Sequence, residues 1–384
     1  MRIGGHLTVQ DLPRGEVQPH PRWAARARLS RPRTRVDRLT VSDAELFELG
    51  ETLDRASGVD ALGPDHCLSA PQYLSRPFVR CKAANIVWTR GAKAIAAPGR
   101  GLIDDFHVGP AGVWPSGLIE QDLQQDAAGW RSRRSAGLEI VPGASIPLCH
   151  YGQRAFGHFV LDGLLQVYLH REALAAGEAR LVHWPFESPW MEDLLTRCGA
   201  PASARRVLSG DLVLLETAHL SSALAGHGVY FPGRFALGFF DWLRGRLTDP
   251  TVAQPPTLKR LYVRRDPDDS RPVIDQDRLE AFLMARGFEI LDSRQDRIDQ
   301  QVQKIASAGL LLSSWGSGAT LAPLLGGARQ VVELTPESVT DPWFARQAAV
   351  HGLRYTPIIH PSTDGAIVPD LGRIAATLDR LTRG

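Results

Sequence analysis

The chain has 384 residues, of which 43% are hydrophobic and 22% are charged, a composition typical of folded proteins rather than disordered ones. Its 44 Lys and Arg side chains nearly balance its 42 Asp and Glu side chains, so the formal net charge is +2. This balance leaves no overall basic field and argues against nucleic acid as a partner. At about 150 residues per domain, the length allows two or three domains, each with a core of its own.

Positive charge is concentrated in the first 40 residues. This segment is rich in Arg and Pro without a sustained hydrophobic period, which predicts an irregular, basic N-terminal extension over residues 1–40. The alternative is a functional one, an electrostatic contact with an anionic membrane surface or an acidic partner. Nine arginines against three acidic residues (Asp11, Glu16 and Asp37) leave a net of +6; the arginines are Arg2, Arg14, Arg22, Arg26, Arg28, Arg31, Arg33, Arg35 and Arg38.

The cysteines and the hydropathy pattern bear on the cellular compartment. Four widely spaced cysteines form neither a CxxC pair nor a zinc spacing with His; they are Cys67, Cys81, Cys149 and Cys198. This usage favours a reducing compartment, with two disulfides as the alternative. The sequence has no run of 18 apolar residues and no apolar core of a secretion signal at its N-terminus. We expect a cytoplasmic protein that contacts the inner face of the membrane peripherally through its basic extension.

The first half of the chain mixes helix-like and strand-like patterns. The spacing of Leu46, Leu49 and Leu53 predicts a helix over 41–58, and a second, strongly periodic helix is expected over 156–175. The remaining elements expected here are strands at 84–88, 92–97, 138–141, 179–183, 205–208 and 212–215, and helices at 189–197 and 231–247.

The second half follows a polar, Pro-rich linker at 248–258 and alternates regularly between strand and helix. Near-continuous apolar strands between short helices predict a parallel sheet that is covered on both faces. Gly287, Gly309 and the pair Gly326–Gly327 are expected to end helices in the left-handed conformation. The expected strands are 259–264, 288–291, 310–313 and 330–334, and the expected helices are 275–286, 299–307 and one that begins at 320–325.

These elements predict an α/β fold of two domains, at 41–250 and 251–384, with the last helix expected to pack back on the first domain. A cleft between two such domains is a common ligand site. His158 and Asp162 lie four residues apart at the start of the helix at 156–175, so they share one face and could act together in proton abstraction. The alternative is a His with local hydrogen bonds and an Asp that caps the helix or is solvated.

Three further groups lie at the ends of the C-terminal strands. The turn Gly316-Ser317-Gly318 follows a buried strand and precedes the expected helix, whose N-terminus would favour an anion; a tight turn with no ligand is the alternative. Glu333 closes another apolar strand, where a carboxylate could bind a ribose diol or be paired at the surface.

The third group is basic. Arg264 and Arg265 end one strand and Arg271 follows, and guanidinium groups match phosphate oxygens. The alternative is a solvated loop in which they pair with its acidic residues. That loop is formally a DxD metal-binding pattern, which the neighbouring arginines disfavour; its acidic residues are Asp266, Asp268 and Asp269.

In this order, the motifs resemble glycosyltransferase family 61, a group often described as capsular polysaccharide biosynthesis glycosyltransferases. The resemblance covers about residues 150–360. Position 315 holds Trp and position 159 holds Phe where the family tends to have His and Trp. The matching segments are 157–162 (GHFVLD), 261–265 (LYVRR), 271–275 (RPVID), Gly287-Phe288, Gln301, 316–321 (GSGATL), 332–334 (VEL), Trp343 and Tyr355.

The resemblance implies a GT-B fold, in which two Rossmann-like domains face a cleft, and transfer with inversion from a nucleotide-diphosphate sugar to a glycan or lipid-linked acceptor. It implies an acceptor-side domain at 41–250 and a donor domain at 251–384, with no metal and no cofactor. His158 or Asp162 would be the base, and Glu333 would hold the ribose. The residues expected to bind the donor are Arg264, Arg265, Arg271, Trp315, Gly316, Ser317, Gly318, Thr320 and Glu333.

Two other functions remain open on the sequence. Because Trp315 replaces the His, one alternative is a non-catalytic protein on the same fold that binds a nucleotide sugar or a glycan. Another α/β enzyme, such as a nucleotide-dependent oxidoreductase, is the third candidate, although the sequence lacks the GxGxxG fingerprint of dinucleotide-binding folds.

Overall fold

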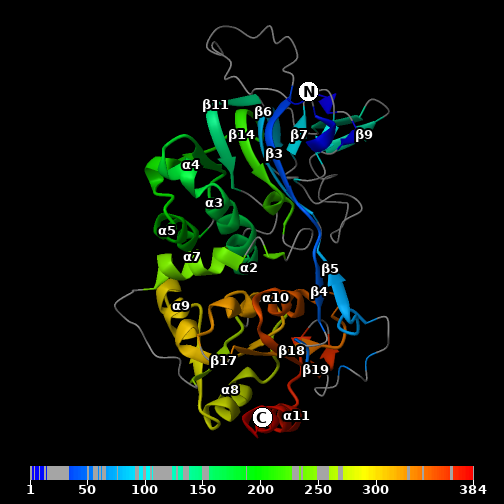
Figure 1. The fold of residues 1–384 in the computed structure, drawn as a ribbon. Helices are drawn as coiled ribbons and strands as arrows, with labels where there is room; N and C mark the ends of the chain where they lie inside the picture. Colours follow the sequence, from blue (N-terminus) through cyan, green and yellow to red (C-terminus); the bar gives the residue numbers. More distant parts are fainter. Residues whose placement is uncertain are drawn as a thin grey trace. The chain divides into compact units, whose positions relative to one another are not determined.

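In the computed structural model the described residues form two compact units, each considered by itself below (Figure 1). Unit 1 comprises Met1–Ala44 and Arg76–Phe231, and unit 2 comprises Glu45–Ser75 and Pro232–Gly384. The predicted division at 250/251 concerns functional domains and stays a prediction. The structure describes residues 2–3, 5–7, 9–12, 14, 34–49, 52–54, 59, 62, 66–75, 77–90, 95–97, 101–103, 106, 123–126, 129–132, 138–148, 155–186, 188–226, 233–234, 237–248, 259–266, 271–326, 329–339, 341–363 and 366–383.

Unit 1 is built on a mixed nine-stranded sheet in the order β13-β12-β11-β14-β6-β7-β8-β2, with β3 also paired to β6. A separate three-stranded sheet has the order β1-β10-β9. The strands of unit 1 are β1 (Arg2–Ile3), β2 (Gly5–Leu7), β3 (Arg35–Ser42), β6 (Phe78–Thr89), β7 (Ile95–Ala97), β8 (Gly101–Ile103), β9 (Leu123–Asp126), β10 (Gly129–Ser132), β11 (Leu138–Pro147), β12 (Arg180–His183), β13 (Arg205–Val207) and β14 (Leu212–Ser221).

Four neighbouring strands of this sheet are parallel, and their spatial order β13-β12-β11-β14 reads 3-2-1-4 in chain order. In open α/β sheets with this order, ligands bind at the carboxyl ends of strands 1 and 4, where the direction of winding reverses. The first crossover from β11 to β12 starts at that edge. The helices of unit 1 are α2 (Phe156–His158), a π turn (Phe159–Leu164), α3 (Leu165–Leu169), α4 (Arg171–Ala175) and α5 (Pro189–Arg197).

Unit 2 contains a five-stranded, fully parallel sheet in the order β16-β15-β17-β18-β19. Its chain order reads 2-1-3-4-5, so the winding reverses between β15 and β17. The strands are β15 (Lys259–Val263), β16 (Phe288–Leu291), β17 (Ala308–Ser314), β18 (Gln330–Pro336) and β19 (Arg354–His360), with short pairs β4 (Leu46–Glu48) and β5 (Gln72–Leu74), and β20 (Ser362–Thr363) and β21 (Ala366–Ile367).

Helices cover this parallel sheet, and the apolar residues of its strands form the core. One core cluster joins Tyr262, Leu312 and Val332 of the strands to Leu279 of α8 and Ile374 of α11, so the last helix packs on this sheet (Figure 1). The α/β class with a parallel sheet, predicted from the apolar strands, is therefore confirmed. The helices are α7 (Leu237–Leu247), α8 (Gln276–Met284), α9 (Ile298–Ser307), α10 (Trp343–His351) and α11 (Leu371–Arg383).

A segment from early in the chain extends the same sheet beyond β19. Leu53 forms a parallel bridge with Tyr355. The N–H of Asp54 donates to the carbonyl of Tyr355 at 2.8 Å, and the N–H of Tyr355 donates to the carbonyl of Thr52 at 2.9 Å. Residues 52–54 therefore pair with backbone N–H and C=O groups on the outer edge of β19, which would otherwise be unpaired.

The predicted helix at 41–58 is wrong. β3 continues to Ser42, and β4 pairs antiparallel with β5, placing Phe47 opposite Tyr73. The two rings stack with centroids 5.0 Å apart. The leucines are spaced as in a helix, but Phe47 pairs with Tyr73, which lies 26 residues away in the sequence. Local propensity does not predict a strand partner at this distance.

The predicted helix after the glycine turn is also wrong, since two 3₁₀ turns, Ser317–Ala319 and Ala322–Leu324, replace it. Pro323 has no N–H to donate and so interrupts a helical ladder. The side chain of Gln347 donates instead to the carbonyl of Thr320 at 3.0 Å. Gly287 does adopt a positive φ of 78° as expected, whereas α9 runs into β17 through Ala308 in an extended conformation, with no left-handed Gly309.

Other expectations are met in part. The predicted strands at 84–88, 179–183, 288–291 and 330–334 and the helices at 189–197, 275–286 and 299–307 coincide with or lie within observed elements to within a few residues. The expected irregular segment at 1–40 contains strands β1 and β2 and the start of β3. It also contains a 3₁₀ turn, Val9–Asp11, and the described residues Leu12, Arg14 and Thr34. The remaining residues of this segment, like the linker beyond Thr248 and the acidic Asp268 and Asp269, lie outside the described residues. Among the helices that the structure describes, none is long and apolar enough to cross a membrane.

Gly326, which follows the second 3₁₀ turn, packs closely against the backbone of α9. A Cβ at this position would overlap the carbonyl oxygen of Ala306 and stand 3.3 Å from its carbon, and backbone cannot move aside as a flexible side chain can. We expect Gly326→Ala to lower the free energy of unfolding by about 1–3 kcal/mol. Gly245→Ala, in α7 where a Cβ meets nothing within 4 Å, should instead raise it by roughly 0.5–1 kcal/mol. Urea unfolding of both variants checks the pair, and equal effects would contradict the packing described.

Candidate functional site

The predicted donor residues of unit 2 gather where the winding of the sheet reverses. Arg264 and Arg265 follow β15 directly, and Trp315 and Gly316 follow β17 directly. β15 and β17 are neighbours that run parallel, with Val263 beside Ser313. The carboxyl ends of two such strands flank the crevice in which ligands of α/β sheets bind.

Arg265 is held in place by the turn opposite it. Its side chain is buried, and Nη1 donates to the carbonyl of Trp315 at 2.8 Å. The guanidinium lies against the Cα of Gly316, where a Cβ would overlap Nη1 and stand 3.1 Å from Cζ. Gly316 also has a φ of 137°, which disfavours other residues. The glycine is therefore required by the arginine rather than by the turn alone.

The second arginine, Arg271, covers the indole of Trp315. Its Cζ lies 4.2 Å from the ring centroid, a cation–π contact. Both Arg265 and Arg271 lower the pKa of Glu333, a carboxyl group on the neighbouring strand β18. Two guanidinium groups and one carboxylate therefore lie near one another at these strand ends, and their charges sum to +1 when Glu333 is ionised.

Glu333 is buried with one oxygen bonded and the other not. The hydroxyls of Tyr355 and Thr335 both donate to Oε2, from Thr335 at 3.2 Å, while Oε1 is buried and has no hydrogen-bond partner among the described residues. Burial is the main reason that the pKa of Glu333 rises from 4.5 to about 7, against the opposing effects of Tyr355, Thr335 and the two arginines. An unmet buried acceptor at this edge suits a ligand hydroxyl.

Arg264 points to a different set of partners. Its guanidinium pairs with Glu280 at 3.3 Å and with Asp277 at 3.7 Å, both on α8, and with Asp292 at 4.0 Å. The predicted alternative was pairing with the acidic residues of the arginines' own loop, whereas the observed partners of Arg264 lie on α8 and after β16. Its predicted role in donor binding stays a prediction.

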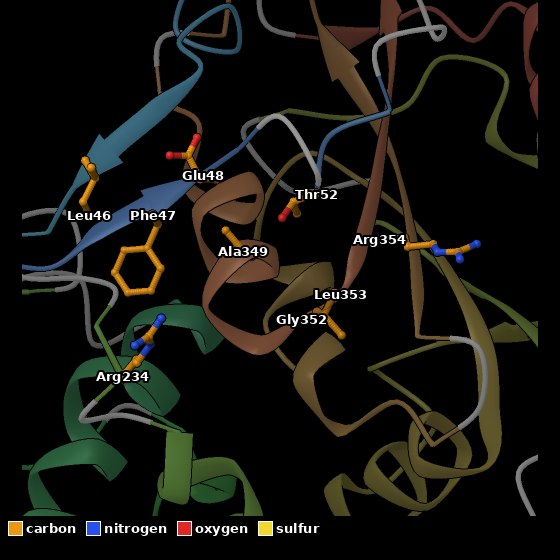
Figure 2. A pocket seen from close by; sticks show the side chains of 9 residues that line it. All are labelled: Leu46, Phe47, Glu48, Thr52, Arg234, Ala349, Gly352, Leu353 and Arg354. Carbon is orange, nitrogen blue, oxygen red and sulfur yellow. The ribbon is translucent and has the colours of Figure 1, made fainter.

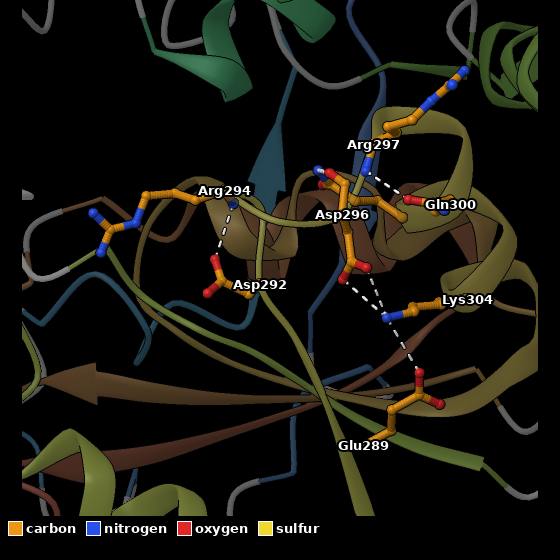
Figure 3. A network of polar contacts seen from close by, with 8 residues as sticks. Glu289, Asp292, Arg294, Asp296, Arg297, Gln300 and Lys304 are labelled. Carbon is orange, nitrogen blue, oxygen red and sulfur yellow. Dashed lines mark hydrogen bonds and ion pairs between the residues drawn. The ribbon is translucent and has the colours of Figure 1, made fainter.

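A polar network fixes the segment between β16 and α9 beside this crevice (Figure 3). Lys304 donates to Asp296 at 2.9 Å and pairs with Glu289 at 3.3 Å. Arg294 pairs with Asp266 at 3.4 Å, which ties this segment to the residue after Arg265. Asp266 is thus engaged with a cation, and no group of three or more His, Cys, Asp or Glu in the described part of the chain is placed to hold a metal ion.

The glycine turn differs from the expected anion site. Two short 3₁₀ turns, Ser317–Ala319 and Ala322–Leu324, follow it in place of the expected helix, so the helix N-terminus that would favour an anion is not formed there. Gly318 instead packs on β15 and β17, where a Cβ would stand 3.1 Å from Ser313 Cβ and 3.3 Å from Val263. Thr320 is fully buried. The small residues of the turn allow its backbone to pack closely against the ends of β15 and β17. The positive charge at these strand ends comes from the arginine side chains.

In unit 1, His158 and Asp162 meet as the sequence predicts. Nδ1 of His158 lies 2.8 Å from Oδ2 of Asp162, and the Asp162 side chain is fully buried while that of His158 is 16% exposed. The pair follows β11 at the carboxyl edge of the parallel strands. A buried carboxylate on one nitrogen orients an imidazole whose other nitrogen can take a proton from a ligand.

The predicted helix at 156–175 is not continuous, and its π turn has a geometric consequence. Side chains four apart rotate by about 40° per step in a regular α-helix, or about 120° from His158 to His170. A π turn holds roughly one extra residue, which turns the following backbone back by about 100°. This geometry favours one face for His158, Asp162, Gln166 and His170, which we call the polar column, and the last three of these residues are buried.

The lower half of this column anchors the helix to β14. Gln166 donates to the carbonyl of His219 at 3.2 Å and accepts from Ser221. His170 packs edge-on against the His219 ring, with centroids 5.4 Å apart, and burial lowers its pKa to about 3. The column is thus fixed at one end, and the His158–Asp162 pair is presented at the other.

Sequence reasoning did not identify Gln166 or the role of Tyr355. The spacing of four from His158 through Asp162 to Gln166 is visible in the sequence, but only a π turn makes it a column. Tyr355 was matched to the family pattern without a role. Its contact with Glu333 joins β19 to β18, which no local pattern predicts.

A cavity of about 430 Å³ lies elsewhere in unit 2 (Figure 2). Arg234 points toward the ring of Phe47, with Cζ 5.8 Å from its centroid, and pairs with Glu45 at 3.7 Å. Thr52, Gly352 and Arg354 also line it. None of the predicted site residues lines this cavity.

Comparison with known proteins agrees with the resemblance. Residues 156–326 match the family model described as glycosyltransferase 61. This range contains the His158–Asp162 pair, the three arginines and the glycine turn, whereas Glu333 and Tyr355 lie beyond it. No curated protein matches the chain. The match supports a glycosyltransferase domain of family 61 in this part of the chain.

The buried carboxyl of Glu333 makes stability depend on pH. Because its pKa is higher in the folded protein than the ordinary 4.5, the folded state binds the proton more tightly. The associated stability is present below about pH 4.5 and is lost as the pH rises through about 7, to a total of roughly 3 kcal/mol. Glu333→Gln should remove this component, so its unfolding free energy should fall less than that of the wild type between pH 5 and 8. Parallel slopes in urea unfolding would contradict this assignment.

Proposed function

We propose that the chain is an inverting glycosyltransferase of the GT-B type that transfers a sugar from a nucleotide-diphosphate donor to a glycan or lipid-linked acceptor, in surface or capsular polysaccharide synthesis. The observation that carries this proposal is the cluster of Arg265, Arg271 and Trp315 at the carboxyl ends of β15 and β17. It falls within the segment that matches glycosyltransferase 61.

In this proposal the donor diphosphate binds to Arg265 and Arg271, and a ribose hydroxyl donates to the free oxygen of Glu333. Guanidinium groups that are already fixed before binding stabilise the charge that develops on the departing diphosphate. This role needs no metal ion and no cofactor. Ser317, Gly318 and Thr320 shape the floor of the donor site, and Arg264 supports it from the α8 side.

The chemical step is a single displacement. An acceptor hydroxyl forms its bond to the anomeric carbon while the bond to the diphosphate breaks, and the diphosphate leaves with the electron pair. His158 takes the hydroxyl proton through the nitrogen that does not face Asp162, and the buried carboxylate stabilises the imidazolium that results. We further propose a cytoplasmic enzyme that contacts the inner face of the membrane peripherally through its basic N-terminal segment.

The assignment of the donor site predicts non-additive losses. Arg265→Ala should weaken the binding of nucleoside diphosphates by about 1.5–3 kcal/mol, or roughly 10- to 150-fold, as expected for a charged hydrogen bond. Gly316→Ala should weaken it similarly because its methyl group displaces the same guanidinium. The double variant should lose little more than either single variant. Calorimetric titration with a nucleoside diphosphate panel checks this, and fully additive losses would show that the two residues act separately.

The base assignment is tested by turnover. His158→Ala and Asp162→Asn should lower the rate of donor-sugar transfer or hydrolysis by about 10²–10⁴-fold and about tenfold or more, respectively, as expected when a general base or its orienting partner is lost. The affinity for the nucleoside diphosphate should not change. Unchanged turnover in both variants would remove the pair as the base, and Tyr168→Phe, on the same helical segment, serves as control.

One observation favours a second function. Trp315 stands where the resembling family tends to have His, and its indole is covered by Arg271. A non-catalytic protein that binds a nucleotide sugar or a glycan on the same fold would retain such a site. Thermal shifts with nucleotide sugars but no consumption of any of them, with or without glycans, would favour this alternative.

A further inference from the structure

A cluster of aromatic rings surrounds the start of α2 and α5 in unit 1. Trp190 of α5 lies 5.1 Å from Phe159 and 5.9 Å from Phe156 between ring centroids. Phe186 lies 5.8 Å from Phe159 and stacks on His183 at 4.1 Å, with the two planes only 12° apart. The cluster thus joins residues that follow β11 to residues that follow β12.

The rings fall into a buried layer and an outer layer. Phe159 and His183 are almost completely buried, with 1% and 2% of their surfaces exposed. Phe156, Phe186 and Trp190 are only half-buried. Three large rings that remain partly in water over a packed aromatic layer form an apolar surface of the kind that marks a binding site.

The position of this surface connects it to His158. Phe156 and Phe159 flank His158 in the same helical segment, and α2 and α5 both begin at the carboxyl edge of parallel strands, where ligands of α/β sheets bind. The outer rings and His158 therefore belong to segments that start at the same edge of the sheet.

The outer rings also differ from other aromatic side chains of this chain. Guanidinium groups lie over the rings of Phe47, Tyr168, Phe282 and Trp315, among others. Within the described residues, no such cation lies over Phe156, Phe186 or Trp190. The apolar C–H face of a pyranose ring packs on aromatic rings of this kind and leaves the sugar hydroxyls free for polar groups.

We propose that Phe156, Phe186 and Trp190 form an aromatic platform on which a sugar ring of a glycan acceptor stacks, at the edge of the sheet from which the helical segment of His158 starts. This inference rests on the proposed function, because it names the acceptor class of the same reaction. It assigns acceptor binding to rings rather than to charged side chains. The sugar next to the reacting hydroxyl, rather than a lipid tail, then contributes most of the acceptor affinity.

Binding of the full-length protein to an array of several hundred defined oligosaccharides, without any nucleotide sugar, tests the platform. The wild type should bind a subset of these glycans, and saturation-transfer NMR should place their C–H protons against aromatic side chains. Trp190→Ala should weaken that binding about tenfold or more, as is usual when an aromatic anchor that a ligand covers is removed. Trp190→Phe keeps a ring and should retain most of it, which separates ring loss from misfolding.

The controls separate this inference from the proposed function. Tyr168→Ala removes a half-buried aromatic ring in the same unit and should change glycan binding less than about twofold. Nucleoside diphosphate affinity should be the same in all variants. Absence of glycan binding by the wild type, or full binding by Trp190→Ala, would overturn the platform even if sugar transfer is observed. Glycan binding that depends on Trp190, in a protein that consumes no nucleotide sugar, would retain the platform and overturn the enzyme.

Discussion

The hydrogen bond from Arg265 to the carbonyl of Trp315, made across the bare Cα of Gly316, is the contact on which the candidate site of unit 2 depends. It fixes a buried guanidinium between the ends of β15 and β17. The same turn presents the indole on which Arg271 rests. A guanidinium that is already immobilised loses little freedom when it binds a phosphate, which is why such pre-organised charge is effective for both affinity and catalysis.

In unit 1 the candidate site is supported from within one helical segment. Its π turn aligns His158 and Asp162 with Gln166 and His170, and the hydrogen bonds of Gln166 to β14 hold this column in register. Both candidate sites thus lie at the carboxyl ends of parallel strands, and in each a buried side chain, Arg265 or Gln166, is fixed by hydrogen bonds to a neighbouring element. Such supporting contacts decide whether reactive groups are held closely enough to act.

Much of the α/β framework could be predicted because local sequence patterns indicate its strands and helix ends. The strands around Leu261 and Val332 are apolar throughout, and Gly287 ends α8 as expected. The two wrong helices have different causes. β4 formed where leucines were spaced as in a helix, because β5 offers it a strand partner. The segment after Gly318 formed 3₁₀ turns, because Pro323 interrupts the ladder and Gln347 takes up the carbonyl of Thr320.

The sequence by itself determined which chemical groups are present and on which strand ends they stand: the arginines after β15, the glycine turn after β17, and a His–Asp pair one helical turn apart. Only the tertiary structure decided their roles. Although Arg264 and Arg265 are neighbours in the sequence, Arg264 pairs with carboxylates of α8, whereas Arg265 donates a hydrogen bond to the glycine turn. The tertiary structure also left one oxygen of Glu333 unmet beside Tyr355. The physical reason is that burial and partners across strands set charge and hydrogen bonding, and these partners are far apart in the chain.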